Sequence, residues 1–98
     1  MSLLVWVIYD VSEDKIRGKV ASLCKRQGLY RVQKSVFLGK IEPNRLDELL
    51  LASEQLIDGN TDSVYVFPLC RSDFGRVKII GQGFDKRLVQ DQIKALVV

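Results

Sequence analysis

The chain contains no histidine at any of its 98 positions. This absence removes the most frequent general base, the Ser-His and Cys-His nucleophile pairs, and metal sites built from imidazole. The two cysteines, Cys24 and Cys70, stand far apart and form no C-x-x-C pair, so neither a zinc knuckle nor a redox dithiol is indicated. Any catalysis by this chain must therefore use carboxylates, Tyr, Lys, Arg, water or a hard cation.

Long apolar runs are also absent, since no segment approaches the ~20 residues that span a bilayer. No basic segment precedes the first apolar stretch and no small-residue cleavage site follows it, which argues against a signal peptide. Hydrophobic residues make up 47% of the chain and charged residues 28%, as in an ordinary globular protein. We expect a cytoplasmic protein without membrane contact.

Acidic residues are missing from Lys15 to Ile41, a stretch that carries eight Lys or Arg residues. The formal charge is +8 over residues 15–41, against −3 over residues 1–14 and −5 over residues 42–62. An ordinary solvated helix face is the simpler explanation, but such faces usually carry both acidic and basic residues, which pair at i,i+4 spacing. The asymmetry favours a surface that binds phosphates of nucleic acid without reading its sequence. The candidate contacts are Arg17, Lys19, Lys25 and Arg26.

The expected elements follow the order strand, helix, strand, strand, helix, strand, which is the split βαβ arrangement of an α+β, ferredoxin-like βαββαβ sandwich. Ser12 is the expected N-cap of the first helix, and Gly28 is the expected residue just beyond its end. An extra C-terminal strand would complete a domain over residues 1–83, and residues 84–98 form a tail with a weak helical pattern. Strands are expected over residues 3–9, 63–69 and 76–80, helices over 13–27 and from Glu42-Pro43 to about 57, and a tight hairpin, or one bent strand, over 29–41.

The strands are apolar on both faces, although both helices of a split βαβ domain pack on one face of the sheet. The uncovered face would then exceed the apolar area that soluble monomers usually expose. We therefore expect a homodimer that pairs its sheet faces. In the first strand the two apolar sets are Val5, Val7 and Tyr9 on one face and Leu4, Trp6 and Ile8 on the other.

A single carboxylate, Asp10, closes the first strand at the point where the chain turns into the first helix. A turn or capping carboxylate is the structural alternative, worth about 1 kcal/mol. The functional interpretation is a Mg²⁺ ligand, because Mg²⁺ commonly binds through only one or two protein carboxylates together with substrate phosphates. One Asp10 from each subunit of a dimer would meet that minimum.

Three segments stand out together, and they are Tyr9-Asp10-Val11-Ser12-Glu13-Asp14, the stretch from Gly28 to Gly39, and the stretch from Asp62 to Cys70. In order and spacing they resemble the CRISPR-associated protein two family over about residues 3–80. The resemblance implies a homodimer of ferredoxin-like subunits that face each other across their sheets, with a late strand that crosses to extend the partner's sheet. It also implies a metal-dependent endonuclease acting on RNA or DNA, with Asp10 near the dimer axis.

The same resemblance implies roles for further residues and partners. Tyr9, Arg17, Arg31 and Phe37 stand at family positions treated as functional, so the implied catalytic set is Asp10, Tyr9, Arg31 and Phe37, and Lys19 stands where the family often has arginine. Family members also bridge the CRISPR-associated integrase, protein one, and hold duplex DNA across their surface. The alternative function is a non-catalytic module that binds single-stranded RNA or DNA, and a small-molecule-sensing domain is a third class. Against the module, residues 75–80 lack the stacked aromatics of RNA-recognition sheets.

Overall fold

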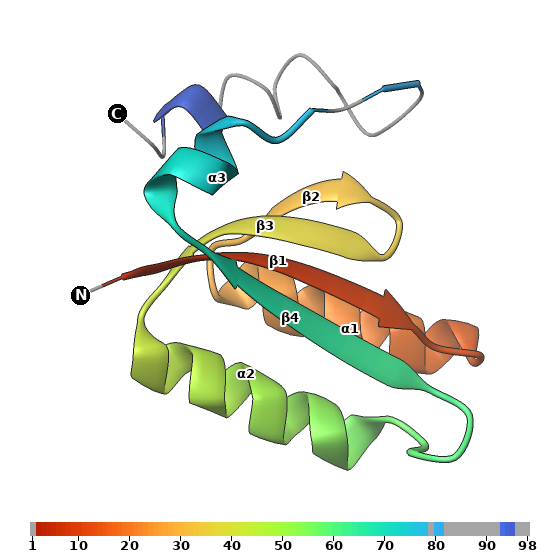
Figure 1. Ribbon diagram of the computed structural model, residues 1–98. Coiled ribbons are helices and arrows are strands. Elements are labelled where there is room, and N and C mark those ends of the chain that lie inside the picture. Colours follow the sequence, from red (N-terminus) through yellow and green to blue (C-terminus); the bar gives the residue numbers. More distant parts are fainter. Residues whose placement is uncertain (1, 79, 82–92, 96–98) are drawn as a thin grey trace.

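The computed structural model describes residues 2–78, 80–81 and 93–95. A four-stranded antiparallel sheet in the order β2-β3-β1-β4 carries α1 and α2 on one face and α3 on the other (Figure 1). The expected α+β architecture with its split βαβ order is confirmed. The elements are β1 (Leu3–Asp10), α1 (Asp14–Arg26), β2 (Tyr30–Gln33), β3 (Val36–Ile41), α2 (Pro43–Leu56), β4 (Ser63–Leu69) and α3 (Arg71–Gly75).

The ends of α1 show one correct and one wrong prediction. Gly28 has a φ of 81° and lets the chain leave α1 through a Schellman motif, in which Gly28 N donates to Lys25 O and Leu29 N donates to Cys24 O. Ser12 is not the N-cap, because the helix begins at Asp14 after Glu13 and has no side-chain cap. Ser12 instead donates its backbone N–H and its hydroxyl to the carboxylate of Asp62.

The remaining boundaries follow local sequence signals. The segment 29–41 is a hairpin whose strands are joined at Lys34 and Ser35, which settles the choice between a hairpin and one bent strand. Pro43 occupies the first turn of α2, where its missing N–H costs nothing. The strand expected over residues 63–69 forms as β4, paired antiparallel with β1.

Two apolar clusters lie on opposite faces of the sheet. The larger cluster packs Val5, Val7 and Tyr9 of β1 against buried residues of α1 and α2. The smaller cluster joins Val32, Leu38, Phe74 and Ile93 to the opposite face. The prediction that both faces are apolar is therefore correct, and this chain itself covers part of the second face through α3.

The strand expected over residues 76–80 is not paired with another strand of this chain at the described residues 76–78 and 80, and pairing with a partner's sheet stays a prediction. The segment before it forms α3, whose first turn is capped by Cys70 Sγ, the acceptor of the Asp73 N–H at 3.4 Å. Burial of Phe74 then holds this turn against the sheet and directs the chain away from the edge of β4. The tail predicted over residues 84–98 lies outside the described residues except for 93–95, which are helical. Within the described residues, no helix has the length and apolarity needed to cross a membrane.

Candidate functional site

Asp10 is exposed at the carboxyl end of β1, where it pairs in register with Ser63 of β4. Side chains alternate along a strand, so Asp10 lies on the same face of the sheet as Ile8 and on the face opposite Tyr9. This alternation is visible in the burial of β1, because Tyr9 is only 3% exposed whereas Ile8 is 37% exposed. The carboxylate is thus attached to a rigid element and remains accessible to a ligand.

The loop after Asp10 is held by a residue that the sequence did not single out for this role. Asp62 Oδ1 accepts the Ser12 N–H at 3.0 Å, and Asp62 Oδ2 accepts the Asp58 N–H at 3.0 Å. These backbone hydrogen bonds, that from Ser12 first, lower the pKa of Asp62 below its usual value. Asp62 therefore stays anionic and links the β1–α1 loop to the α2–β4 loop. This link fixes the backbone that directly follows Asp10.

Tyr9, Arg31 and Phe37 form one connected cluster on the helix side of the sheet. The Tyr9 and Phe37 rings stack with centroids 6.3 Å apart, and the Arg31 guanidinium lies 5.6 Å from the centre of the Phe37 ring. Both Tyr9 Oη and Arg31 donate hydrogen bonds to Lys34 O, at 3.0 Å and 2.7 Å. Burial is the main cause that raises the pKa of the Tyr9 hydroxyl. The cluster therefore secures the β2–β3 turn.

Within one subunit, this cluster and Asp10 lie on opposite faces of the sheet. The four residues of the predicted catalytic set are thus not brought together in a single chain. The described residues also contain no group of three or more Cys, Asp or Glu side chains that could hold a metal ion. One subunit offers Asp10 as an accessible oxygen donor at this place, which fits Mg²⁺ only if water, substrate or a second subunit supplies the remaining ligands.

The predicted phosphate contacts on α1 do not all point to the same surface. Arg17 forms an ion pair with Asp14 and donates to Val11 O at 3.3 Å, so its charge is directed back to the β1–α1 loop. Lys25 is exposed, whereas Lys19 and Arg26 line the space between the two long helices.

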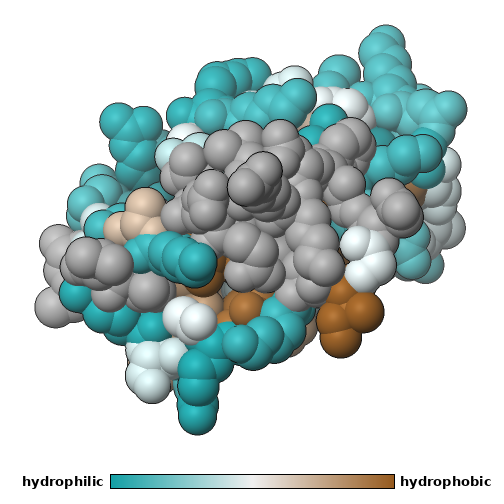
Figure 2. All heavy atoms as spheres, turned by 90° about the horizontal axis from the view of Figure 1, so that it is seen from above, coloured by the Kyte–Doolittle hydropathy of each residue, from teal (hydrophilic) through white to brown (hydrophobic). Residues whose placement is uncertain are grey.

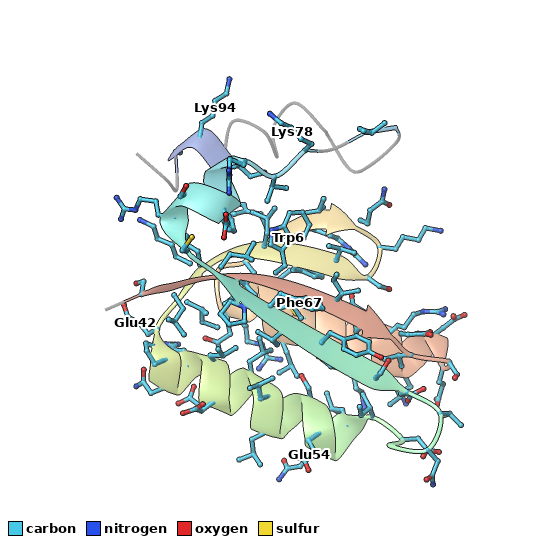
Figure 3. The ribbon with its side chains drawn as sticks, viewed as in Figure 1. Trp6, Glu42, Glu54, Phe67, Lys78 and Lys94 are labelled. Atoms are coloured by element: carbon cyan, nitrogen blue, oxygen red, sulfur yellow. The ribbon has the colours of Figure 1, made fainter. Side chains whose placement is uncertain are left out.

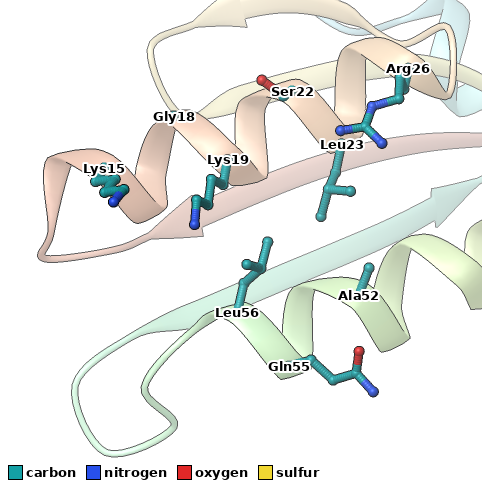
Figure 4. A pocket seen from close by; sticks show the side chains of 9 residues that line it. All are labelled: Lys15, Gly18, Lys19, Ser22, Leu23, Arg26, Ala52, Gln55 and Leu56. Carbon is teal, nitrogen blue, oxygen red and sulfur yellow. The ribbon is translucent and has the colours of Figure 1, made fainter.

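That space is a groove of about 550 Å³ between α1 and α2, here called the helix groove (Figure 4). Lys15, Lys19 and Arg26 line its α1 side, and Leu23 and Leu56 point toward each other across it. Lys15 belonged to the basic stretch in the sequence but was not among the predicted contacts. Its spacing of four residues from Lys19 was the signal that could have added it.

The second face of the sheet is partly uncovered, and its exposed part is here called the open sheet face, defined by Ile8, Tyr65 and Phe67. Tyr65 is 54% exposed and Phe67 is 47% exposed, and their rings stack with centroids 6.3 Å apart. Figure 3 shows Trp6 on the side of the sheet toward α3, and Figure 2 shows hydrophobic side chains at the surface seen from that side. Asp10 lies at the margin of this apolar surface.

Comparison with known proteins places these features in a family. The family model described as CRISPR associated protein Cas2 matches residues 1–77. A relative from Korarchaeum cryptofilum, named CRISPR-associated endoribonuclease Cas2, is 38% identical over 85 residues, which cover 84% of this chain and 88% of the relative. The crystal structure of Streptococcus pyogenes Cas2 is similar with a TM-score of 0.71 and 34% identity, covering 80% of this chain and 99% of that chain.

A protein of Thermoproteus tenax, named CRISPR-associated endonuclease Cas1/endonuclease Cas2 fusion, is 30% identical over 67 residues, which are 68% of this chain and 25% of that protein. The family model covers most of the chain, and the Korarchaeum cryptofilum relative is matched over most of its own length. The resemblance inferred from the three sequence segments is thereby confirmed. The chain belongs to the CRISPR-associated Cas2 family.

Proposed function

We propose that this protein is a metal-dependent endonuclease that cleaves nucleic acid, RNA in the first place, as a homodimer. The observation that carries the proposal is the position of Asp10, accessible at the end of β1 on the same sheet face as the apolar residues Ile8, Tyr65 and Phe67. The names of the Korarchaeum cryptofilum relative and of others like it support RNA as the substrate.

The dimer pairs the open sheet faces of two subunits. An isologous contact brings the same surface of both copies together. We propose that the two-fold axis passes beside Asp10, as the family resemblance implies, so that the two Asp10 carboxylates approach each other. This arrangement supplies the second carboxylate that one subunit lacks. It also covers Tyr65 and Phe67, which a monomer leaves in water.

In this dimer the paired Asp10 carboxylates would hold Mg²⁺, a hard cation that prefers oxygen ligands and keeps several waters. Bound there, the ion would polarise a phosphoryl oxygen and help to activate the attacking water. The chain's own contribution is to position the carboxylates, which Asp62 does by fixing the loop that follows Asp10. The Tyr9, Arg31 and Phe37 cluster supports the neighbouring β2–β3 turn from the helix side.

The helix groove binds the phosphates of the substrate. Lys15, Lys19 and Arg26 line it without a described ion pair, so their charges are free to face a polyanion. A Cβ added at Gly18 would meet no atom within 4 Å, so packing inside the chain does not require glycine there and a phosphate can approach the backbone of α1 closely. Binding through phosphates predicts little sequence preference and strong salt dependence.

The test is cleavage of labelled single-stranded RNA and duplex DNA by the purified protein with Mg²⁺ and with a chelator. We expect Mg²⁺-dependent products from wild type and none from Asp10→Asn, which keeps the shape of the side chain but loses its charge. Asp73→Asn is the matched control, because this exposed acid on α3 pairs with Arg76, three residues further along the chain, and belongs neither to the end of β1 nor to the helix groove. It should leave cleavage unchanged. Undiminished cleavage by Asp10→Asn would contradict the proposal.

A second candidate function is a dimeric bridge that holds duplex DNA for the CRISPR integrase Cas1 during spacer acquisition. The fusion of Cas1 and Cas2 in one chain of Thermoproteus tenax favours this role, because fusion keeps the two proteins in one complex. Co-purification with Cas1 and spacer integration in a reconstituted reaction test this role. Normal integration by Asp10→Asn, with no cleavage by wild type under any divalent metal, would establish the bridge in place of the nuclease.

A further inference from the structure

The end of the subunit remote from Asp10 is strongly basic. A hollow of about 390 Å³, here called the basic hollow, is lined by Arg26 at the end of α1, Lys40 of β3 and Arg45 in the first turn of α2. None of these three cations has an ion pair or side-chain hydrogen bond among the described residues. Three unpaired cations from three separate elements would repel one another less if an anion lay between them.

The single acid in the basic hollow does not neutralise it. Glu42 also lines the hollow, and its Oε1 accepts a hydrogen bond from Ser2 Oγ at 2.8 Å, which lowers the pKa of Glu42 and keeps it anionic. This one negative charge offsets only one of the three cations. Figure 3 shows Glu42 at the start of α2. The lining therefore keeps a net positive charge.

The first turn of α2 adds a backbone donor to the basic hollow. The side chain of Glu42 does not cap the helix, so the N–H of Arg45, which lines the hollow, has no partner within the helix. Gln27, whose side-chain amide carries N–H donors, lines the same hollow. A hollow with unpaired cations and unused donors is suited to a phosphate group.

The basic hollow is continuous with its neighbours through shared residues. Arg26 lines the helix groove (Figure 4), and it also lines the basic hollow. Lys40 lines both the basic hollow and a hollow of about 380 Å³ that also contains Arg71, on the α3 side of the sheet. The helix groove, the basic hollow and this third hollow together form a basic track, which runs along α1, around the end of the sheet and toward α3.

A track that turns in this way suits a flexible chain better than a duplex. Bending a duplex by 40–90° costs about 1–6 kcal/mol even when the bend is spread over 20–30 base pairs. Here the turn lies within one subunit whose longest dimension is 37 Å, which is roughly 11 base pairs at about 3.4 Å each. A single strand bends about its own backbone bonds without such a cost.

We propose that the basic hollow is a second phosphate-binding site, in which Arg26, Lys40 and Arg45 hold the backbone of a single-stranded nucleic acid as it leaves the helix groove and turns around the end of the sheet. This inference rests on the proposed function in one respect, because it takes the helix groove as the place where the nucleic acid arrives. It adds a contact far from Asp10 that selects single strands over duplexes.

The experiment measures binding, without divalent metal, of a labelled single-stranded oligonucleotide and of a duplex of equal length by fluorescence anisotropy. Lys40→Ala and Arg45→Ala should each weaken single-strand binding about 3- to 10-fold and reduce the salt slope by about 0.7, while duplex affinity changes less than about twofold. Lys34→Ala is the matched control, because it removes one exposed charge from the β2–β3 turn and lines none of the three hollows. It should leave both affinities unchanged.

Three outcomes would overturn the inference. The first is an effect of Lys40→Ala and Arg45→Ala no larger than that of Lys34→Ala, and the second is an equal loss for duplex and single strand. The third comes from titrating inorganic phosphate at constant ionic strength, if it shifts the amide resonance of Arg45 while the oligonucleotide does not. Cleavage is not read in these assays, so a protein that binds as expected but never cuts refutes only the nuclease proposal.

Discussion

Replacing Phe67 with alanine should break the proposed dimer. Phe67 is 47% exposed, and a phenylalanine of roughly 200 Å² therefore leaves about 95 Å² for a partner to cover. At ~25 cal/mol per Å², truncation removes about 2 kcal/mol per subunit. A two-fold interface contains the residue twice, so the dimer loses roughly 4 kcal/mol and its Kd rises about 10³-fold.

Sedimentation equilibrium at micromolar concentrations measures this change. Wild type should have twice the chain mass of 11.1 kDa, and Phe67→Ala should approach the mass of one chain. Leu51→Ala is the matched control, since Leu51 on α2 is 58% exposed and does not belong to the open sheet face. Equal weakening by Leu51→Ala, a dimer that resists Phe67→Ala, or a monomeric wild type would refute the reasoning.

Three more predictions concern the scaffold of the site. Asp62→Asn should speed hydrogen exchange in the loop after β1 near neutral pH. Because the folded pKa of Asp62 is lowered, the stabilisation from its carboxylate is complete above the usual pKa of 3.8 and is lost as the pH falls through the folded pKa. The exchange rates of variant and wild type should therefore converge at that low pH. At pH 8 a thiol reagent should label exposed Cys70 rapidly and buried Cys24 only after unfolding, because burial also raises the pKa of Cys24 to about 12. The stability that comes from keeping the Cys24 thiol neutral is complete below about pH 9 and declines as the pH rises toward 12. Equal labelling rates for the two cysteines would contradict the burial of Cys24. Gly39→Ala should lower the free energy of unfolding by about 1–3 kcal/mol in urea titrations, because Gly39 has a φ of 154° and a Cβ there would lie 3.1 Å from Leu29 Cδ2; an unchanged midpoint would contradict this.

Local signals in the sequence predicted much of the fold correctly. Gly28 ends α1 and Pro43 begins α2 because each residue's backbone preference acts within a few positions. The helix α3 was missed, since its cap is the weak acceptor Cys70 Sγ and its stability comes from burying Phe74 against a distant strand. A helix of five residues is too short for a hydrophobic repeat to indicate it, so this contact could not be predicted from the sequence pattern.

The candidate site shows the same division between local and distant causes. The place of Asp10 at the end of β1 could be read from the apolar run before it. The bond between Asp62 and Ser12 joins residues 50 positions apart, so no pattern near Ser12 distinguishes it from an N-cap. Likewise, Arg17 looked equivalent to Lys19 in the sequence, and only the fold shows that Asp14 and Val11 O already engage its guanidinium.

The pairing of two Asp10 carboxylates is tested most directly by mixed dimers. Wild type and Asp10→Asn are unfolded together in equal amounts and refolded, which gives wild-type, mixed and variant dimers in the proportions one to two to one. If both carboxylates are needed, Mg²⁺-dependent cleavage per total protein should fall to about a quarter of the wild-type rate. A rate near one half would show that each Asp10 acts alone, and a rate equal to that of wild type would contradict any role of Asp10 in cleavage.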